Sequence, residues 1–183
     1  MSKFNTRTTC TIAVLAAMYV PLSLFLSVQG PNNLKFSFGS LPVVVAALLM
    51  GPVEAALTAF IGEFLKQLLS YGFTATTLLW TIPTMLRGLV IGAAAIRFKR
   101  TAKPLTARPI LCNIVCIAAA VITTAANTLV IWLDSVIYGY YSFAYVFGAT
   151  AARFVTGMIT SVLVALVAVP LVYLLERQKL FRT

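Results

Sequence analysis

Long apolar segments, separated by short polar or Gly/Pro-containing stretches, dominate this chain. Six such segments lie at about residues 10–28, 41–50, 53–69, 78–96, 110–133 and 146–175. At a rise of about 1.5 Å per residue, a helix of roughly twenty residues crosses a hydrocarbon core of about 30 Å. The pattern therefore predicts an all-α integral membrane protein: a bundle of six transmembrane helices in a single membrane domain, residues 1–183.

The second segment is too short to cross a membrane alone, because it has about ten residues and ends at Gly51-Pro52. We expect a re-entrant segment or a short second helix that its neighbours protect. A polar stretch at 29–33 precedes it and leads into Leu34-Lys35-Phe36-Ser37-Phe38. This alternation is typical of a short extended strand or of the lip of a loop.

The composition agrees with a membrane protein and excludes several kinds of catalytic and metal site. The chain is 61% hydrophobic and 10% charged, whereas soluble domains average about 45–50% apolar and 25% charged residues. It contains no histidine and only four acids, which excludes Ser-His-Asp triads and His-ligated metal sites. No GxxxxGK[ST] sequence occurs, so other subunits must supply any ATP hydrolysis. We expect neither an enzyme nor a bound cofactor or metal.

The formal charge of +10 would favour a nucleic-acid partner if it were spread over a soluble surface. Ten of the 14 cations, however, fall into three regions that a six-helix bundle places on one side: Lys3, Arg7, Arg97, Lys99, Arg100, Lys103, Arg108, Arg177, Lys179 and Arg182. By the positive-inside rule this side is cytoplasmic and holds both termini. The loops at 29–40, 70–77 and 138–145 then face outward, and no nucleic acid is needed.

Four cations remain after this assignment: Lys35, Lys66, Arg87 and Arg153. Counted inward from the outer helix ends, Arg153 lies roughly 10 Å deep and Arg87 roughly 14 Å deep. Asn127 and Glu63 fall at a similar depth. Charges at such depth are costly unless they are paired or hydrated, and they usually mark a functional interior.

Two interpretations of these buried charges stay open. Glu63 could pair with Arg87 or Arg153 as a clasp between helices. Alternatively, the helices surround an outward-facing cavity with surplus positive charge, in which arginine grips a carboxylate of an anionic small molecule. Glu63 would then accept hydrogen bonds from amino groups of that ligand. A single acid cannot balance both arginines, which favours the cavity.

Aromatic residues near the outer face support a cavity less strongly. Tyr71 and Trp80 could line it or belong to the interfacial aromatic belt. Phe36 and Phe38 alternate in a loop rather than at a helix end, which favours an outer gating loop that closes over a pocket. The predicted substrate-binding residues are Lys35, Phe36, Phe38, Glu63, Lys66, Tyr71, Trp80, Arg87, Asn127 and Arg153.

Several motifs together resemble a known family. Ala13 and Ala17 form a small-residue face that allows close helix approach. The stretch Leu34-Lys35-Phe36-Ser37-Phe38-Gly39-Ser40-Leu41-Pro42 leads to Leu49-Met50-Gly51-Pro52, and Leu86-Arg87-Gly88-Leu89-Val90-Ile91-Gly92 follows. With six segments in about 180 residues, the chain resembles the substrate-binding S component of energy-coupling factor (ECF) vitamin transporters. The Phe-Ser-Phe-Gly loop and Gly72-Phe73-Thr74 look most like the folate-type branch.

The resemblance implies a vitamin-capture subunit in the plasma membrane of a prokaryote. Residues 29–40 would gate its pocket, and Ala13 and Ala17 would contact a transmembrane coupling subunit. Two ABC-type ATPases would drive the assembly, and the S component would topple in the lipid bilayer to release its cargo inside. An anionic vitamin is expected, folate first. Pantothenate, riboflavin, thiamine and a queuosine precursor are alternatives.

Two other classes remain as alternatives to an S component. A stand-alone secondary carrier needs a coupling-ion site or a proton relay, and one midplane acid without any histidine supports this poorly. A membrane enzyme lacks a catalytic constellation here, and a purely structural subunit would not explain the surplus buried cations.

Overall fold

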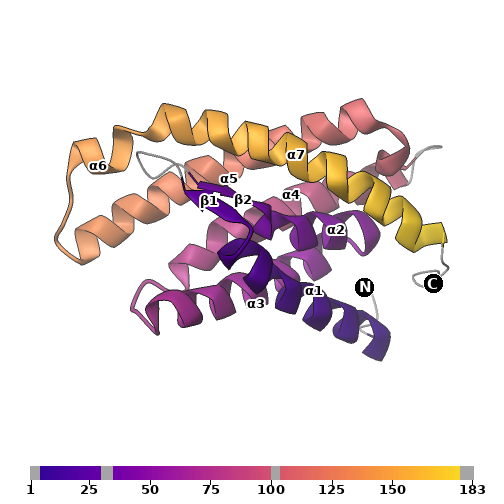
Figure 1. Ribbon diagram of the computed structural model, residues 1–183, viewed down its shortest axis with the longest axis horizontal. Helices are drawn as coiled ribbons and strands as arrows, with labels where there is room; N and C mark the ends of the chain where they lie inside the picture. The colour runs from indigo at the N-terminus through magenta and orange to yellow at the C-terminus, as the bar shows by residue number, and fades with distance from the viewer. Residues whose placement is uncertain (1–4, 30–34, 100–103, 178–183) are drawn as a thin grey trace.

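The computed structural model describes residues 5–29, 35–99 and 104–177, which form an elongated helical bundle (Figure 1). Its helices are α1 (Thr6–Leu24), α2 (Leu41–Leu49), α3 (Pro52–Tyr71), α4 (Ile82–Lys99), α5 (Pro109–Ile137), α6 (Phe143–Phe147) and α7 (Thr150–Arg177). Three short 3-10 turns accompany them: η2 (Phe38–Ser40), η3 (Leu79–Thr81) and η4 (Leu105–Ala107). Strands β1 (Ser27–Gln29) and β2 (Lys35–Ser37) form an antiparallel pair.

The predicted all-α membrane bundle is confirmed. Within the described ranges, four helical stretches are long and apolar enough to cross a membrane: Thr6–Leu24, Leu79–Lys99, Pro109–Ile137 and Phe143–Arg177. Helix α3 has a comparable length of 20 residues but is less apolar, because it carries Glu54, Glu63 and Lys66. Both of its acids are buried inside the bundle, where the other helices shield them from lipid.

Several predicted boundaries were wrong by a few residues. The first helix covers Thr6–Leu24 rather than 10–28, because Ser27–Gln29 leaves it to pair with Lys35–Ser37 in the register Val28↔Phe36. The alternating stretch is therefore a strand. The last segment divides into α6 and α7. Hydropathy marks apolar stretches but does not reveal where backbone hydrogen bonds change partner.

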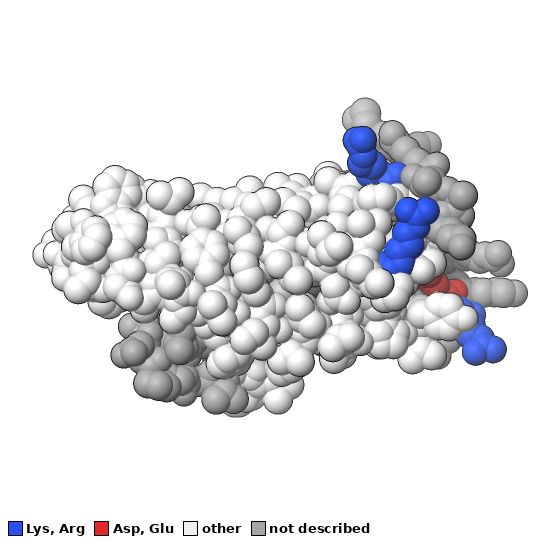
Figure 2. Space-filling view, turned by 90° about the horizontal axis from the view of Figure 1, so that it is seen from above, with Lys and Arg blue, Asp and Glu red and all other residues white. Residues whose placement is uncertain are grey.

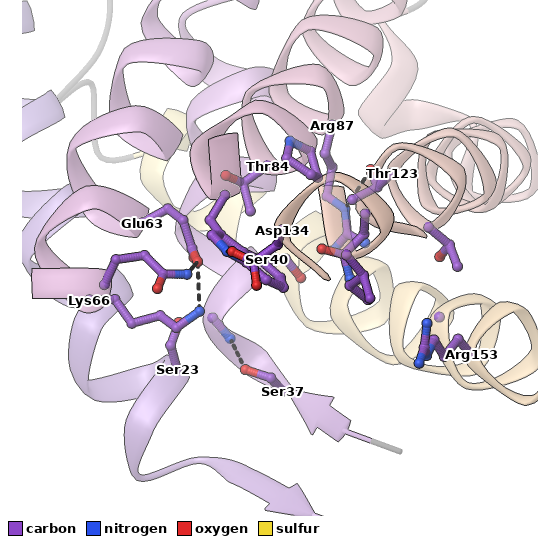
Figure 3. A pocket seen from close by; sticks show the side chains of 18 of the residues that line it. Ser23, Ser37, Ser40, Glu63, Lys66, Thr84, Arg87, Thr123, Asp134 and Arg153 are labelled. Atoms are coloured by element: carbon purple, nitrogen blue, oxygen red, sulfur yellow. Dashed lines mark hydrogen bonds and ion pairs between the residues drawn. The ribbon is translucent and has the colours of Figure 1, made fainter. Parts of the chain in front are cut away.

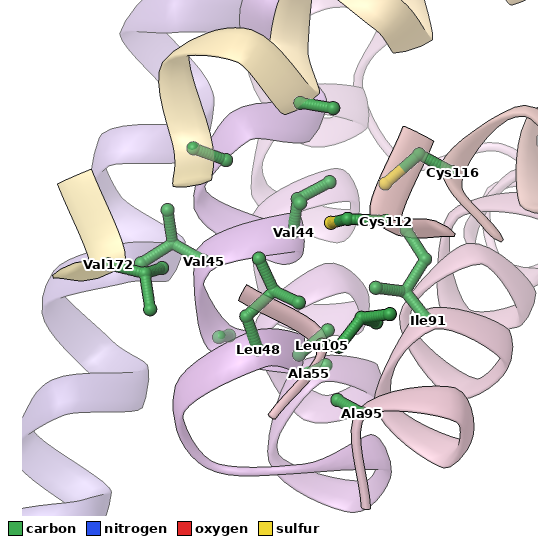
Figure 4. Close-up of a cluster of buried hydrophobic side chains, with 14 of the residues drawn as sticks. Val44, Val45, Leu48, Ala55, Ile91, Ala95, Leu105, Cys112, Cys116 and Val172 are labelled. Carbon is green, nitrogen blue, oxygen red and sulfur yellow. The ribbon is translucent and has the colours of Figure 1, made fainter. Parts of the chain in front are cut away.

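Helix α2 is the short protected helix that was one of the two expectations. Every residue from Pro42 to Leu48 is buried, and α2 contacts α1, α3, α4 and α7. Its side chains pack with Ile91, Cys112 and Val172 in one hydrophobic cluster (Figure 4). Surrounding helices therefore shield a helix too short to span the membrane by itself.

Helix α4 approaches the start of α3 through two glycines. A Cβ atom at Gly92 would lie 2.4 Å from Cα of Pro52, and one at Gly88 would lie 2.9 Å from the carbonyl carbon of Ala55. The Gly88-x-x-x-Gly92 spacing puts both glycines on one helix face, which permits close backbone contact. This contact fixes α4, and with it Arg87, against the rest of the bundle.

Basic side chains gather at one end of the molecule. Figure 2 shows the visible lysines and arginines there, at the end where α1 and α5 begin and α4 and α7 end in Figure 1. The described residues of this group are Arg7, Arg97, Lys99, Arg108 and Arg177. The others, Lys3, Arg100, Lys103, Lys179 and Arg182, lie outside the described residues. The cytoplasmic assignment of this end stays a prediction.

Candidate functional site

A cavity of about 710 Å³ lies in the half of the bundle away from the basic end. It is enclosed by the C-terminal parts of α3 and α5, the N-terminal parts of α4 and α7, the end of α1, and η2. Small-molecule sites typically measure roughly 300–1,000 Å³. Its volume therefore suits a ligand of vitamin size.

Seven of the ten predicted site residues line this cavity: Glu63, Lys66, Tyr71, Trp80, Arg87, Asn127 and Arg153. Phe36 and Phe38 are not among the lining residues, and Phe38 packs against the hydrophobic core instead. Their neighbours Ser37 and Gly39 line the cavity instead. For Phe36 and Ser37 in β2 this follows from the alternation of strand residues between opposite faces. Lys35 belongs to β2, but its side chain lies outside the description. A role of these three residues in binding stays a prediction.

Glu63 is a hydrogen-bonding hub rather than a partner of either arginine. It accepts hydrogen bonds from the Tyr19 hydroxyl of α1, from Lys66 Nζ at 2.7 Å and from Gln67 Nε2 at 2.9 Å. The expected clasp with Arg87 or Arg153 is therefore wrong. Three hydrogen bonds do not exhaust the acceptor sites of a carboxylate, so acceptance of a hydrogen bond from a ligand by Glu63 stays a prediction.

Arg87 and Arg153 are both held by neutral acceptors. Arg87 Nε donates to the Thr123 hydroxyl at 3.4 Å. Arg153 donates to the carbonyl oxygens of Val146 and Tyr145 at 3.1 and 3.2 Å. Among the residues that the structure describes, neither forms an ion pair with a carboxylate. Their charges thus remain available to a ligand in the cavity.

Asp134 is a second buried carboxylate in the cavity wall that the sequence analysis missed. It accepts hydrogen bonds from Trp80 Nε1 of η3, at 3.4 Å, and from the hydroxyl of Tyr140 after α5. Partial burial and this hydrogen bond raise the pKa of Tyr140 above its ordinary value. Asp134 therefore connects two outer segments to α5.

Thr123, Thr156 and Thr160 are further polar lining residues that could have been found from their spacing. Thr123 and Asn127 on α5, and Thr156 and Thr160 on α7, are each four residues apart and line the cavity. Polar residues at this spacing share one face of a helix. In otherwise apolar helices, such a stripe indicates an interior surface that contacts polar groups.

The lining has a positive balance: Lys66, Arg87 and Arg153 stand against Glu63 and Asp134. Lys66 and Glu63 neutralise each other. Among the described residues, no cluster of three or more His, Cys, Asp or Glu side chains could hold a metal ion. The site is thus suited to a small anion with hydrogen-bonding groups, gripped by arginine.

Fold and cavity together are those of a membrane helix bundle with room for a small molecule, and comparison with known proteins identifies the family. Residues 3–177 match the family model described as "ECF-type riboflavin transporter, S component". The chain belongs to this family of transporter S components. The expected resemblance to ECF S components is confirmed.

A solved structure supports the same fold. The chain is similar to the protein described in "Structure and mechanism of the S component of a bacterial ECF transporter", with a TM-score of 0.58 and 21% identity. The match covers 93% of this chain and 98% of that one. At this level of identity the likeness concerns the fold alone, so the ligand must be argued from the cavity of this chain.

Proposed function

We propose that this chain captures an anionic vitamin from outside the cell, with folate favoured, and delivers it inward as the substrate-binding subunit of an ATP-driven importer. The observation that carries the proposal is the pair Arg87 and Arg153, which line the cavity without a carboxylate partner among the described residues. Two guanidinium groups without an ion pair, in a cavity whose charged lining residues leave one surplus positive charge, are stabilised by an anionic ligand.

Folate fits this arrangement with its two chemically different ends. Its glutamate carboxylates would bind Arg87 and Arg153. Its pterin ring would stack on Trp80, which Asp134 holds in the cavity wall, since aromatic rings pair favourably. Glu63 supports this site indirectly, because its hydrogen bonds orient Lys66 and other lining side chains.

Riboflavin is the second candidate, and the matched family favours it by name. Its flat ring system would suit the aromatic side chains of the cavity wall, Trp80, Tyr138 and Tyr145. It carries no charge at neutral pH, however, and would leave Arg87 and Arg153 without a counter-ion. Cavity charge thus supports folate, whereas the family description supports riboflavin.

Energy for transport would come from partner subunits. We propose a transmembrane coupling subunit and two ABC-type ATPases, assembled with this chain in the plasma membrane of a prokaryote. Ala13 and Ala17 are exposed on α1, beside Val14 and Met18, which are 59% and 47% exposed. This open small-residue face suits contact with another membrane helix. The basic end would face the cytoplasm with both termini.

A thermal-shift screen of the detergent-purified chain tests the ligand. A ligand that binds only the folded state raises the melting temperature by mass action. Folate should raise it in proportion to the logarithm of its concentration. A shift with riboflavin alone would transfer the assignment to the second candidate. An unchanged melting temperature with every vitamin would contradict vitamin capture. In a separate experiment, uptake by the chain alone in vesicles would favour the stand-alone carrier.

A further inference from the structure

Three tyrosines mark the mouth of the cavity. Tyr71 at the end of α3, Tyr138 directly after α5 and Tyr145 of α6 all line the cavity, although they are 73%, 50% and 47% exposed. A side chain that lines a cavity and is also about half exposed lies where the cavity meets the outside. The mouth is therefore at the end of the bundle that carries α6, opposite the basic end (Figures 1 and 2).

Tyr145 is held at this mouth by contacts with two other parts of the chain. Its ring packs edge-on against the Tyr140 ring, with the ring centroids 5.7 Å apart and the planes at 85°, a favourable geometry for an aromatic pair. Its carbonyl oxygen accepts a hydrogen bond from Arg153 at 3.2 Å. In the described part of the chain, the rings of Tyr71 and Tyr138 form no such pair. Tyr145 is therefore the mouth residue whose position is fixed.

The Tyr140 ring is in turn held by Asp134. Its hydroxyl donates a hydrogen bond to this buried carboxylate of α5. Figure 3 shows Asp134 and Arg153 projecting from two different helices into the same cavity. Tyr145 thus lies between a tyrosine that is attached to α5 and an arginine that belongs to α7.

The segment before α6 has few other attachments. Every residue from Val136 to Tyr145 is exposed, whereas Val146 is fully buried. Gly139 has a φ of 74°, and nothing lies within 4 Å of the place of a Cβ atom there. Segments with few buried contacts open locally at a low cost in free energy. The part of the segment before Val146 can therefore move outward while Val146 stays anchored.

We propose that the Tyr145 ring is a gate at the cavity mouth and that the Tyr140–Asp134 hydrogen bond is its latch. The structure shows the closed position. When the Tyr140 hydroxyl leaves Asp134, the Tyr145 ring loses its edge-on partner and turns outward, which opens the cavity. This gate belongs to a different segment from the predicted gating loop at 29–40. It rests on the proposed function only for the ligand that passes, because access to the cavity can be measured without a vitamin.

A gate has a kinetic signature that a binding residue lacks. The latch closes the mouth of the empty and of the loaded protein alike. Its removal should therefore raise the association and dissociation rate constants by the same factor and leave the affinity unchanged. A ring that only stacks on the bound ligand would instead change the dissociation rate constant and the affinity. The association rate constant thus decides between the two roles.

Tyr140→Phe tests the latch, because it keeps the ring and the Asp134–Trp80 hydrogen bond and removes only the hydroxyl. Both rate constants should rise about fivefold or more, the effect of one hydrogen bond to a charged group. Tyr145→Ala tests the gate and should raise them at least as much. Stopped-flow fluorescence with folate and with riboflavin measures association after mixing and dissociation after dilution. Association at the wild-type rate in both variants overturns the gate, and a rise in Tyr145→Ala alone overturns the latch.

Tyr141 provides the matched controls. It belongs to the same segment, is 49% exposed and is not among the residues that line the cavity. Tyr141→Phe and Tyr141→Ala should leave both rate constants and the melting temperature unchanged. If they accelerate binding and release as much as Tyr140→Phe and Tyr145→Ala do, the whole segment has been loosened and the gate assignment is overturned.

Thiol labelling measures access to the cavity without any vitamin. Thr160 lines the cavity on α7, about 15 Å along this helix from the end nearest α6. Thr160→Cys therefore places a thiol inside the cavity. Cys10→Ser is combined with it, because Cys10 is exposed whereas Cys112 and Cys116 are buried. A negatively charged methanethiosulfonate then reports how fast a small anion reaches the new thiol.

Labelling of this thiol should become at least about threefold faster when Tyr140→Phe or Tyr145→Ala is added, since the mouth is open more of the time. Tyr141→Ala should have no effect. Equal labelling rates in all these proteins overturn the gate, whichever ligand the chain binds. If the wild type binds neither vitamin while the labelling rates differ as expected, the proposed function is refuted and the gate stands.

Discussion

Replacing Lys66 should destabilise the empty protein strongly, and removing its partner charge as well should reverse most of the loss. The Lys66 side chain is 18% exposed and the Glu63 side chain 4% exposed, with 2.7 Å between Nζ and Oε1. Lys66→Met leaves the Glu63 carboxylate charged among the buried helices, supported only by the Tyr19 hydroxyl and Gln67. Breaking a buried ion pair on one side typically costs about 3–5 kcal/mol.

The double variant Glu63→Gln/Lys66→Met removes both charges. Exchange of a whole buried ion pair for uncharged groups is often nearly neutral, and the amide oxygen of glutamine still accepts the Tyr19 hydroxyl. At about 2–4 °C per kcal/mol for a chain of this size, Lys66→Met should lower the melting temperature by roughly 6–20 °C. The double variant should regain at least half of that loss.

Thermal unfolding in detergent, without ligand, measures Lys66→Met, Glu63→Gln and the double variant, which together form a double-mutant cycle. Lys99→Met is the control, because Lys99 is an exposed lysine at the basic end and surface substitutions usually change stability by less than about 0.5 kcal/mol. If Lys66→Met melts like wild type, or if the two substitutions are additive, Glu63 and Lys66 are not a closed pair. The surplus of positive charge at Arg87 and Arg153 would then need another explanation.

Three further changes probe packing, the cavity wall and burial. Gly92→Ala should lower stability by about 1–3 kcal/mol, because its methyl group meets the Pro52 backbone; unchanged thermal unfolding would refute this contact. Asp134→Ala should speed vitamin release in stopped-flow fluorescence, because Trp80 loses its hydrogen-bond acceptor. Asp134→Asn should restore slow release. Equal release rates in the wild type and both variants argue against a role of Asp134 in holding Trp80. A maleimide dye should label the exposed Cys10 of the folded protein, while the buried Cys112 stays unlabelled until unfolding; early double labelling would contradict the packing.

Much of the fold could be predicted from the sequence, because long apolar runs indicate membrane helices. Even the short helix at Leu41–Leu49 was recognisable from its length and from the Gly51-Pro52 that ends it. The pairing of Ser27–Gln29 with Lys35–Ser37 could not be recognised from the sequence. Strand pairing depends on contacts between segments, and the apolar composition of residues 10–28 hid the point where the helix ends.

The cavity could be predicted only in part. Arg87 and Arg153 stood out because charge is costly inside a membrane, and both line the cavity. One of the two interpretations paired Glu63 with an arginine, but Lys66, one turn away on the same helix, forms the ion pair instead. Ser23 and Ser40, which also line the cavity, gave no signal, because small hydroxyl residues are common in membrane helices.

The most direct test of an anion-binding cavity is calorimetric titration of folate into the purified wild-type chain and into Arg87→Ala and Arg153→Ala, with riboflavin titrated in parallel. Each arginine variant should bind folate at least about tenfold more weakly, equivalent to about 1.4 kcal/mol, while melting near the wild-type temperature. Folate affinity that is unchanged in both variants, or binding of riboflavin alone with no effect of either arginine, would contradict capture of an anionic vitamin by these two residues.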